Sequence, residues 1–155
     1  MAYAEPVLLD TDTLSELSRG NATVRARAQA YLAAFGRLTI SSVTVFERLR
    51  GYRQALLVGK PFHVQLQAFQ ALVRSCVVLP FDEEAADVSA NIWSACTRSQ
   101  RQQRGDILIA GIAVARQIPL VTRNRRDFEA LGKAAAVNLR LADWTSGAKR
   151  VTRPG

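Results

Sequence analysis

The stretch from Val7 to Leu14 constrains the fold more than any other part of the chain. Its first three residues are apolar and lead directly into Asp10. A short apolar run of this kind is typical of a buried strand in a parallel sheet. Thr13-Leu14-Ser15-Glu16 then matches a capping box, which predicts a helix with Thr13 as its N-cap. Asp10 is therefore expected at the carboxyl edge of a sheet, where α/β proteins bind their ligands.

The same alternation of short apolar runs and helix-like segments continues along the chain. Residues 38–41, 76–79 and 119–122 predict further strands, and residues 137–141 predict an edge strand. Amphipathic segments separate these runs, and residues 107–115 are apolar nearly all round, as in a buried helix. The pattern predicts an α/β fold, with a central parallel sheet of four to five short strands flanked by helices. Residues 1–144 are expected to form one domain, followed by a basic tail at residues 145–155.

The composition points to a globular protein with a polyanionic partner. With 155 residues, 48% of them hydrophobic, the chain is long enough for one domain with a full core. No apolar run approaches the roughly 20 residues of a membrane span, and no signal pattern opens the chain, so a cytoplasmic location is expected. Lysine and arginine number 21 against 13 acidic residues, a net charge of +8. Arginine pairs well with phosphate, although an ordinary basic surface would also explain the charge.

Scarce histidine and cysteine exclude several classes of site. The chain has one histidine, His63, which rules out a nuclease that uses a histidine pair. Cys76 and Cys96 lack metal-ligand spacing and are expected to be buried thiols. A Ser-His-Asp or Cys-His site would depend on His63, which has no acidic neighbour in sequence.

Four widely spaced carboxylates remain as candidates for the chemistry. Asp10 ends the first strand, Glu47 lies in an early turn of a helix, Asp106 heads the buried helix and Asp127 follows the fourth strand. If they converge at one sheet edge, they make a site for a hard cation such as Mg²⁺ or Mn²⁺, which takes oxygen ligands. Such an ion supports phosphoryl displacement without a histidine or a nucleophilic side chain. Each acid also has a structural alternative, as a helix cap, a partner of a helical arginine or a turn residue.

The chain resembles PIN-domain ribonucleases of the VapC toxin type. The resemblance is carried by residues 8–17, 40–47, 105–110 and 120–128, which follow the order of the family's motifs. It implies a small parallel-sheet fold, a Mg²⁺ or Mn²⁺ cofactor, cleavage of single-stranded RNA, a homodimer and inhibition by a cognate antitoxin. The expected function is therefore a metal-dependent endoribonuclease that acts as the toxin of a type II toxin–antitoxin pair.

Carried over residue by residue, the resemblance makes Asp10, Glu47 and Asp106 the acidic core, with Asp10 and Asp106 as metal ligands. The chain departs from the family at Asp12, where an asparagine is usual, and either Asn124 or Asp127 could fill the fourth acidic place. The supporting residues are Thr11, Asp12, Thr122 and Asn124. Arginines that flank the acidic motifs are expected to bind RNA phosphates: Arg48, Arg50, Arg53, Arg123, Arg125 and Arg126.

Two other functions stay open at this point. Asp10-Thr11-Asp12-Thr13 resembles the DxDxT opening of haloacid-dehalogenase-type phosphatases, with Asp10 as nucleophile. Against it, residues 105–110 lack the second acid of that family's GDxxxD motif, and Glu47 would have no role. The second alternative is a catalytically inactive PIN scaffold that only binds RNA, which the retained acids argue against.

Overall fold

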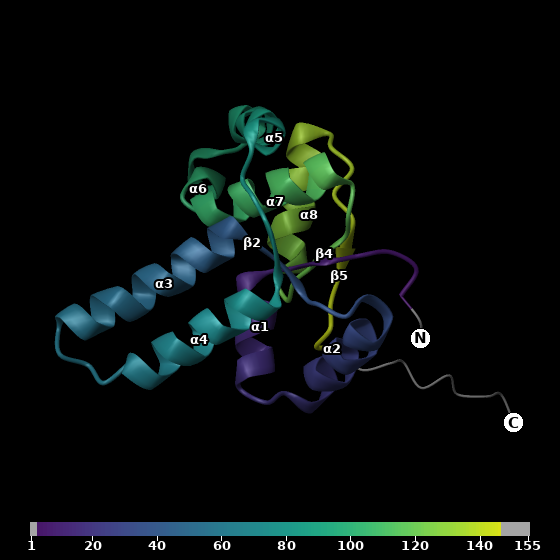
Figure 1. The fold of residues 1–155 in the computed structure, drawn as a ribbon. Coiled ribbons are helices and arrows are strands. Elements are labelled where there is room, and N and C mark those ends of the chain that lie inside the picture. Colours follow the sequence, from purple (N-terminus) through teal and green to yellow (C-terminus); the bar gives the residue numbers. More distant parts are fainter. Residues whose placement is uncertain (1–2, 147–155) are drawn as a thin grey trace, which may run out of the picture.

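The computed structural model describes residues 3–146 and has an α/β fold built on short parallel strands (Figure 1). In this part of the chain, β1 (Leu8–Leu9), β4 (Leu120–Val121) and β5 (Leu141–Ala142) form a three-stranded sheet in the order β1-β4-β5. β2 (Thr39–Ser41) pairs with β3 (Val77–Leu79), and β2 also lies next to β1. All three strand pairings are parallel, which confirms the predicted fold class.

Helices cover both faces of this sheet. They are α1 (Thr11–Ser18), α2 (Ala22–Phe35), α3 (Ser42–Leu57), α4 (His63–Ser75), α5 (Glu83–Ala95), α6 (Arg98–Arg101), α7 (Arg104–Arg116) and α8 (Arg125–Ala135). Adjacent strand residues serve opposite faces, since alternate side chains of a strand point to opposite sides. Leu8 packs in one core cluster with α5, α7 and α8, whereas Leu9 packs in the other with α1 and α2.

Two local predictions are wrong. α1 begins at Thr11 rather than after Thr13, because the Asp10 carboxylate accepts a hydrogen bond from the backbone N–H of Thr11 and caps the helix itself. Glu16 pairs instead with Arg19 and Arg123. The edge strand is not at residues 137–141 but at Leu141–Ala142, because parallel pairing with β4 aligns Leu141 with Leu120.

The helix expected to be buried is the centre of one core cluster. α7 buries Ile107, Ile109 and Ile112, and it packs closely against α5. Gly111 makes this approach possible. A Cβ atom at position 111 would lie 1.8 Å from Ser89 Oγ and 2.8 Å from the backbone oxygen of Ala85.

Gly111→Ala is expected to destabilise the protein by about 1–3 kcal/mol or more, because α5 and α7 must move apart to admit the methyl group. Gly51→Ala is the matched control: position 51 is exposed on α3, with nothing within 4 Å of an added Cβ. There the better helix propensity of alanine should leave stability unchanged or raise it by up to about 1 kcal/mol. Urea unfolding of the two variants measures the difference, and equal midpoints would contradict this account of the packing.

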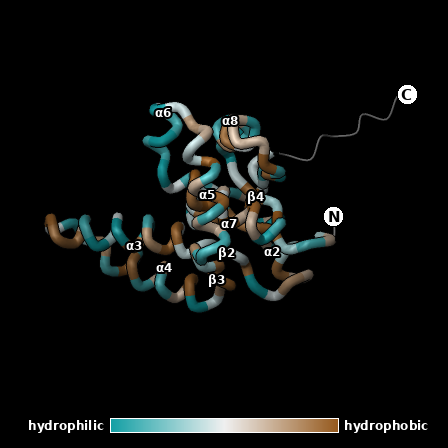
Figure 2. Tube along the Cα trace, turned by 90° about the horizontal axis from the view of Figure 1, so that it is seen from above, coloured by the Kyte–Doolittle hydropathy of each residue, from teal (hydrophilic) through white to brown (hydrophobic). Residues whose placement is uncertain are grey.

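α3 and α4 form a hairpin that extends away from the sheet (Figure 1). Apolar side chains are exposed around its turn, where Leu57 is 87%, Val58 69% and Val64 74% exposed. Figure 2 shows the same region as hydrophobic segments at the outer end of the hairpin. Within residues 3–146, every helix is too short or too polar to traverse a membrane. The predicted basic tail lies outside the described residues from position 147 onward.

Candidate active site

Asp10 is a buried carboxylate at the carboxyl end of β1. Its side chain is 5% exposed and accepts hydrogen bonds from the backbone N–H of Thr11 (2.8 Å) and from the hydroxyl of Thr122 (2.9 Å). Thr122 follows β4, the strand paired with β1, and the Asp10 backbone N–H donates to the oxygen of Val121. The parallel pairing of β1 and β4 therefore sets the position of the Asp10 carboxylate.

Asp12 is joined to the loop that follows β4. Its carboxylate accepts from the backbone N–H of Arg123 at 3.3 Å and lies 3.5 Å from Thr122 Oγ1. The Thr122 oxygen in turn accepts from the backbone N–H of Asn124 at 3.0 Å. Thr122 thus connects both aspartates at the start of α1 to the loop that follows β4, and its role as a supporting residue of the site stays a prediction.

Glu47 is held by a chain of hydroxyl groups. Its Oε1 accepts from Thr11 Oγ1 at 3.3 Å, and Thr11 Oγ1 lies 3.0 Å from Thr44 Oγ1. The Ser41 hydroxyl donates to Thr44 Oγ1 at 3.2 Å and also caps α3 by accepting from the Thr44 backbone N–H. Sequence reasoning assigned no site role to Ser41 or Thr44. Their position shortly before Glu47, at the start of α3, is the signal that would have identified them.

Gly105 brings Glu47 against the first turn of α7. A Cβ atom at position 105 would lie 2.7 Å from Glu47 Oε2, so the carboxylate occupies the space that a larger residue would need. Asp106, the next residue, is half-buried in the same turn. The positive end of the α7 dipole favours carboxylates at this place. Gly105 therefore leaves the space that Glu47 occupies, and Asp106 adds a negative charge in the same turn.

The carboxylates act on one another electrostatically. Burial raises the pKa of Asp10 from 3.8 to about 7, and the charges of Asp12 and Asp106 act in the same direction. Burial, followed by the charges of Glu47, Asp127 and Asp12, raises the pKa of Asp106 from 3.8 to about 6. Asp106 thus lies within electrostatic reach of the other three predicted acids and of Asp12. Asp127 acts on Asp106, whereas the backbone N–H of Asn124 is bound to Thr122.

This donor set suits a cation that keeps much of its water. Among residues 3–146, no three acidic, histidine or cysteine side chains are close enough together to enclose a metal ion by themselves. Mg²⁺ is commonly bound by one or two carboxylates with several waters, so a complete protein cage is not required. Asp10 and Asp106 are the best candidates for metal ligands. Burial and neighbouring negative charge disfavour their ionised forms, and a cation bound to them would offset this cost.

An open cavity of about 570 Å³ adjoins the acids. Its lining includes Glu47, Asp106 and two basic residues, Arg50 and Arg104. Arg123, whose backbone N–H donates to Asp12, forms an ion pair of 2.7 Å with Glu16 through its side chain. Arg50 therefore lies beside two of the acids, whereas the guanidinium of Arg123 is paired with Glu16, and phosphate binding by either residue stays a prediction.

The other predicted arginines differ in their surroundings. Arg53 and Arg126 are exposed, and Arg125 is exposed with Glu129 at 3.8 Å. Arg48 instead packs within the α3–α4 hairpin: it donates to Ser15 Oγ at 2.9 Å, and its guanidinium carbon lies within 6 Å of the Tyr52 and Phe69 ring centroids. We therefore remove Arg48 from the candidate phosphate-binding residues.

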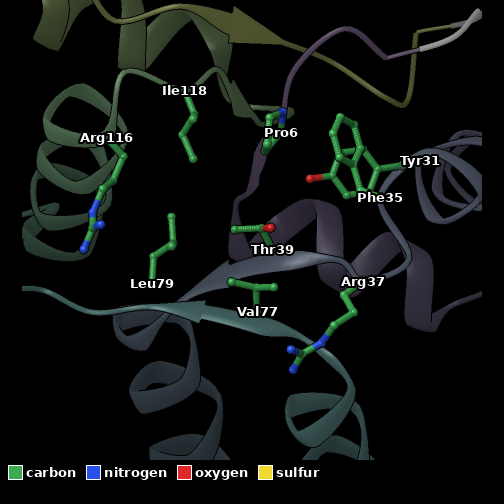
Figure 3. Close-up of a pocket in the computed structure, with 9 residues that line it drawn as sticks. All are labelled: Pro6, Tyr31, Phe35, Arg37, Thr39, Val77, Leu79, Arg116 and Ile118. Atoms are coloured by element: carbon green, nitrogen blue, oxygen red, sulfur yellow. The ribbon is translucent and has the colours of Figure 1, made fainter.

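A second cavity, of about 380 Å³, lies on another side of the sheet (Figure 3). Pro6, Thr39 and Val77 mark it as close to the amino ends of the strands, away from Asp10. Its two arginines are already bound within the protein, Arg37 to the backbone oxygen of Cys76 and Arg116 to Asp82. No carboxylate lines it, so it is not the candidate active site.

Comparisons with a family model and with known proteins show what this chain is similar to. The family model described as PIN domain matches residues 7–134. The chain is 32% identical over 111 residues to the tRNA(fMet)-specific endonuclease VapC of Shigella flexneri, covering 71% of this chain and 77% of the relative. Two solved structures share the fold. The DNA-bound VapBC of Salmonella typhimurium has a TM-score of 0.70 at 24% identity, covering 93% of this chain and 99% of the other. FitAcB of Neisseria gonorrhoeae has a TM-score of 0.65 at 25% identity, covering 89% and 97%.

Proposed function

Since the chain belongs to the PIN domain family, and within it resembles the VapC endonucleases, we propose that it is a metal-dependent endoribonuclease and the toxin of a type II toxin–antitoxin pair. The observation that carries the proposal is the gathering of Asp10, Glu47, Asp106 and Asp127 at one edge of the sheet, with the pKa values of Asp10 and Asp106 raised. The proposed cofactor is Mg²⁺ or Mn²⁺.

Each acidic residue and each threonine beside it has a separate proposed role. Asp10 and Asp106 would hold the cation, which when bound would activate water and offset the charge that develops in phosphodiester hydrolysis. Thr122 positions the Asp10 carboxylate, and Thr11 positions Glu47. Glu47 accepts the proton of the attacking water, because it faces the same cavity as Asp106. Asp127 adds negative charge beside Asp106 and fills the fourth acidic place.

Turnover of RNA against turnover of a phosphomonoester tests this function. We expect cleavage of a mixed RNA pool in Mg²⁺ or Mn²⁺, its loss in EDTA, its return when the metal is restored, and no hydrolysis of the phosphomonoester. Phosphomonoester hydrolysis would favour the haloacid-dehalogenase alternative. Tight RNA binding without cleavage in either metal would favour the inactive scaffold. The family match over residues 7–134 supports neither alternative.

Arg50 and Arg126 are proposed to bind RNA phosphates beside the acids. Replacing both by glutamine should weaken RNA binding and reduce the slope of log Kd against log salt concentration by about 1 for each phosphate that is no longer neutralised. Arg25 and Arg74 are exposed on α2 and α4, so the double glutamine variant at these positions is a charge-matched control. Equal salt slopes for the two double variants would assign the RNA path to another face.

The expected protein partner is a cognate antitoxin. An acidic cleft rimmed by arginines can be closed by a peptide that places its own cationic side chain between the carboxylates. Expression of this chain alone should therefore arrest growth, and co-expression of the antitoxin should restore it. A chain that is harmless when expressed alone at levels verified by immunoblot would remove the main support for the toxin role.

We further propose a homodimer in the cytoplasm, where the RNA substrate is found. Three large apolar side chains are exposed together around the turn of the α3–α4 hairpin: Leu57, Val58 and Val64. Exposed apolar residues that lie together mark protein–protein contacts. Light scattering at micromolar concentration checks the oligomeric state, and the mass of a monomer would contradict it.

A further inference from the structure

One large aromatic side chain lies exposed beside the acidic cluster. Phe46 is 60% exposed and directly precedes Glu47 on α3, whereas Val43 and Thr44, at the start of the same helix, are buried. Its ring lines the cavity of about 570 Å³ that also contains Glu47 and Asp106. Single exposed aromatic residues are common on protein surfaces, so exposure alone does not indicate a function for Phe46, and the groups around it are needed.

Two basic side chains near Phe46 are placed to bind the phosphates of an RNA backbone. The guanidinium carbon of Arg50, one turn further along α3, lies 5.3 Å from the centroid of the Phe46 ring. Arg104, at the start of α7, lines the same cavity. Proteins that bind single-stranded nucleic acid combine these two features, a ring on which a base stacks and basic groups that follow the backbone.

The lining of the cavity also carries two amide groups. Gln102 and Gln103 lie between α6 and α7 and are exposed. Each side-chain amide has two donors and an acceptor, which is what recognition of the edge of a base requires. A flat apolar face, two cations and two amides thus surround a space that begins next to the proposed catalytic carboxylates.

We propose that Phe46 stacks on an unpaired base of the nucleotide next to the cleaved phosphate, a step that rests on the proposed nuclease function. A base within a duplex has both faces covered by its neighbours, so only an unpaired base can lie on the ring. Phe46 thereby makes the enzyme select single-stranded segments and loops. Gln102 and Gln103 contact the edge of the stacked base, and Arg50 contacts its phosphate.

The test uses a short single-stranded RNA that the wild type cuts at one site, and two copies with an abasic nucleotide on either side of that site. For the wild type, one of the two abasic RNAs should have a KM about tenfold higher. Phe46→Ala should raise the KM of the intact RNA by about the same factor, with little change in kcat and no additional increase on the abasic RNA. Phe46→Trp should restore the KM. Leu32→Ala, on α2 and 39% exposed, is the control and should change neither parameter.

Equal sensitivity of wild type and Phe46→Ala to the abasic nucleotide would overturn the stacking role. Unchanged RNA kinetics in Phe46→Ala together with weaker antitoxin binding would assign the ring to a protein contact instead. If the wild type cuts no RNA, the proposed function fails. The stacking of a base on Phe46 is then tested by itself, through binding of a fluorescent single-stranded RNA to wild type and to Phe46→Ala. Equal affinities would overturn the stacking role.

Discussion

Asp10→Asn is expected to lower the rate of RNA cleavage by about a thousandfold, which corresponds to about 4 kcal/mol of transition-state stabilisation. The substitution removes one of the two carboxylates proposed to hold the cation and preserves the shape of the side chain. The protein should stay folded, because asparagine is as good an N-cap as aspartate and can still accept from the Thr11 backbone N–H. Its amide can also donate to the Thr122 oxygen, so both contacts of residue 10 are retained in altered form.

Asp82→Asn is the matched control for this experiment. Asp82 is also the N-cap of a helix, α5, and its carboxylate accepts from the backbone N–H of Ala85 at 3.0 Å. It lies outside the acidic cluster and pairs with Arg116. Cleavage by Asp82→Asn should stay within a few-fold of wild type. Full activity in Asp10→Asn, or disappearance of its folded structure by circular dichroism, would show that Asp10 has a purely structural role as a helix cap.

The architecture could be predicted because hydrophobic patterning determines it. Leu8 and Leu9 belong to opposite faces of a sheet buried on both sides, so the strand appears as a continuous apolar run. The exact start of α1 could not be predicted in the same way. Two competing caps, Asp10 and Thr13, are both chemically suitable, and the choice depends on where β1 ends against β4. Tertiary pairing, which is not visible in a local motif, decided it.

The acidic residues proposed for the site, and Thr11 and Thr122 beside them, could be named from the sequence, whereas the link of Ser41 and Thr44 to Glu47 could not. A carboxylate beside an apolar run is conspicuous, as at Asp10 and Asp106. Ser41 and Thr44 are ordinary helix-start residues in sequence, and their link to Glu47 through Thr11 requires the packing of α1 against α3. Arg48 shows the opposite error. Its place beside Glu47 in sequence suggested a role in the cleft, but neighbouring helix residues point in different directions, and Arg48 faces Ser15 and α4.

The metal-free protein is expected to become less stable as the pH rises from about 4 to about 7. The folded-state pKa of Asp10 is raised to about 7 and that of Asp106 to about 6, chiefly by burial, from 3.8. In this window the folded protein binds more protons than the unfolded chain, so the free energy of unfolding falls with increasing pH. The stabilisation is complete below about pH 4 and absent above about pH 7. A shift of about three pKa units at Asp10 corresponds to about 4 kcal/mol. The pKa of Glu16 is lowered by its hydrogen bonds with Asn21 and Arg19, so titration of Glu16 changes stability in the opposite direction.

Urea unfolding in EDTA at about pH 5 and about pH 8 measures this change, and Asp10→Asn supplies the comparison. Because asparagine does not titrate, the variant should be more stable than wild type at the higher pH and should depend less on pH. Addition of Mg²⁺ or Mn²⁺ should raise the wild-type melting temperature more at the higher pH than at the lower, since the cation competes with protons for the same carboxylates. The variant should show little of this rise. Wild-type stability that is constant across the whole window without metal would mean that burial and neighbouring charge do not raise the pKa values of Asp10 and Asp106, and the electrostatic basis of the proposed cation site would fail with it.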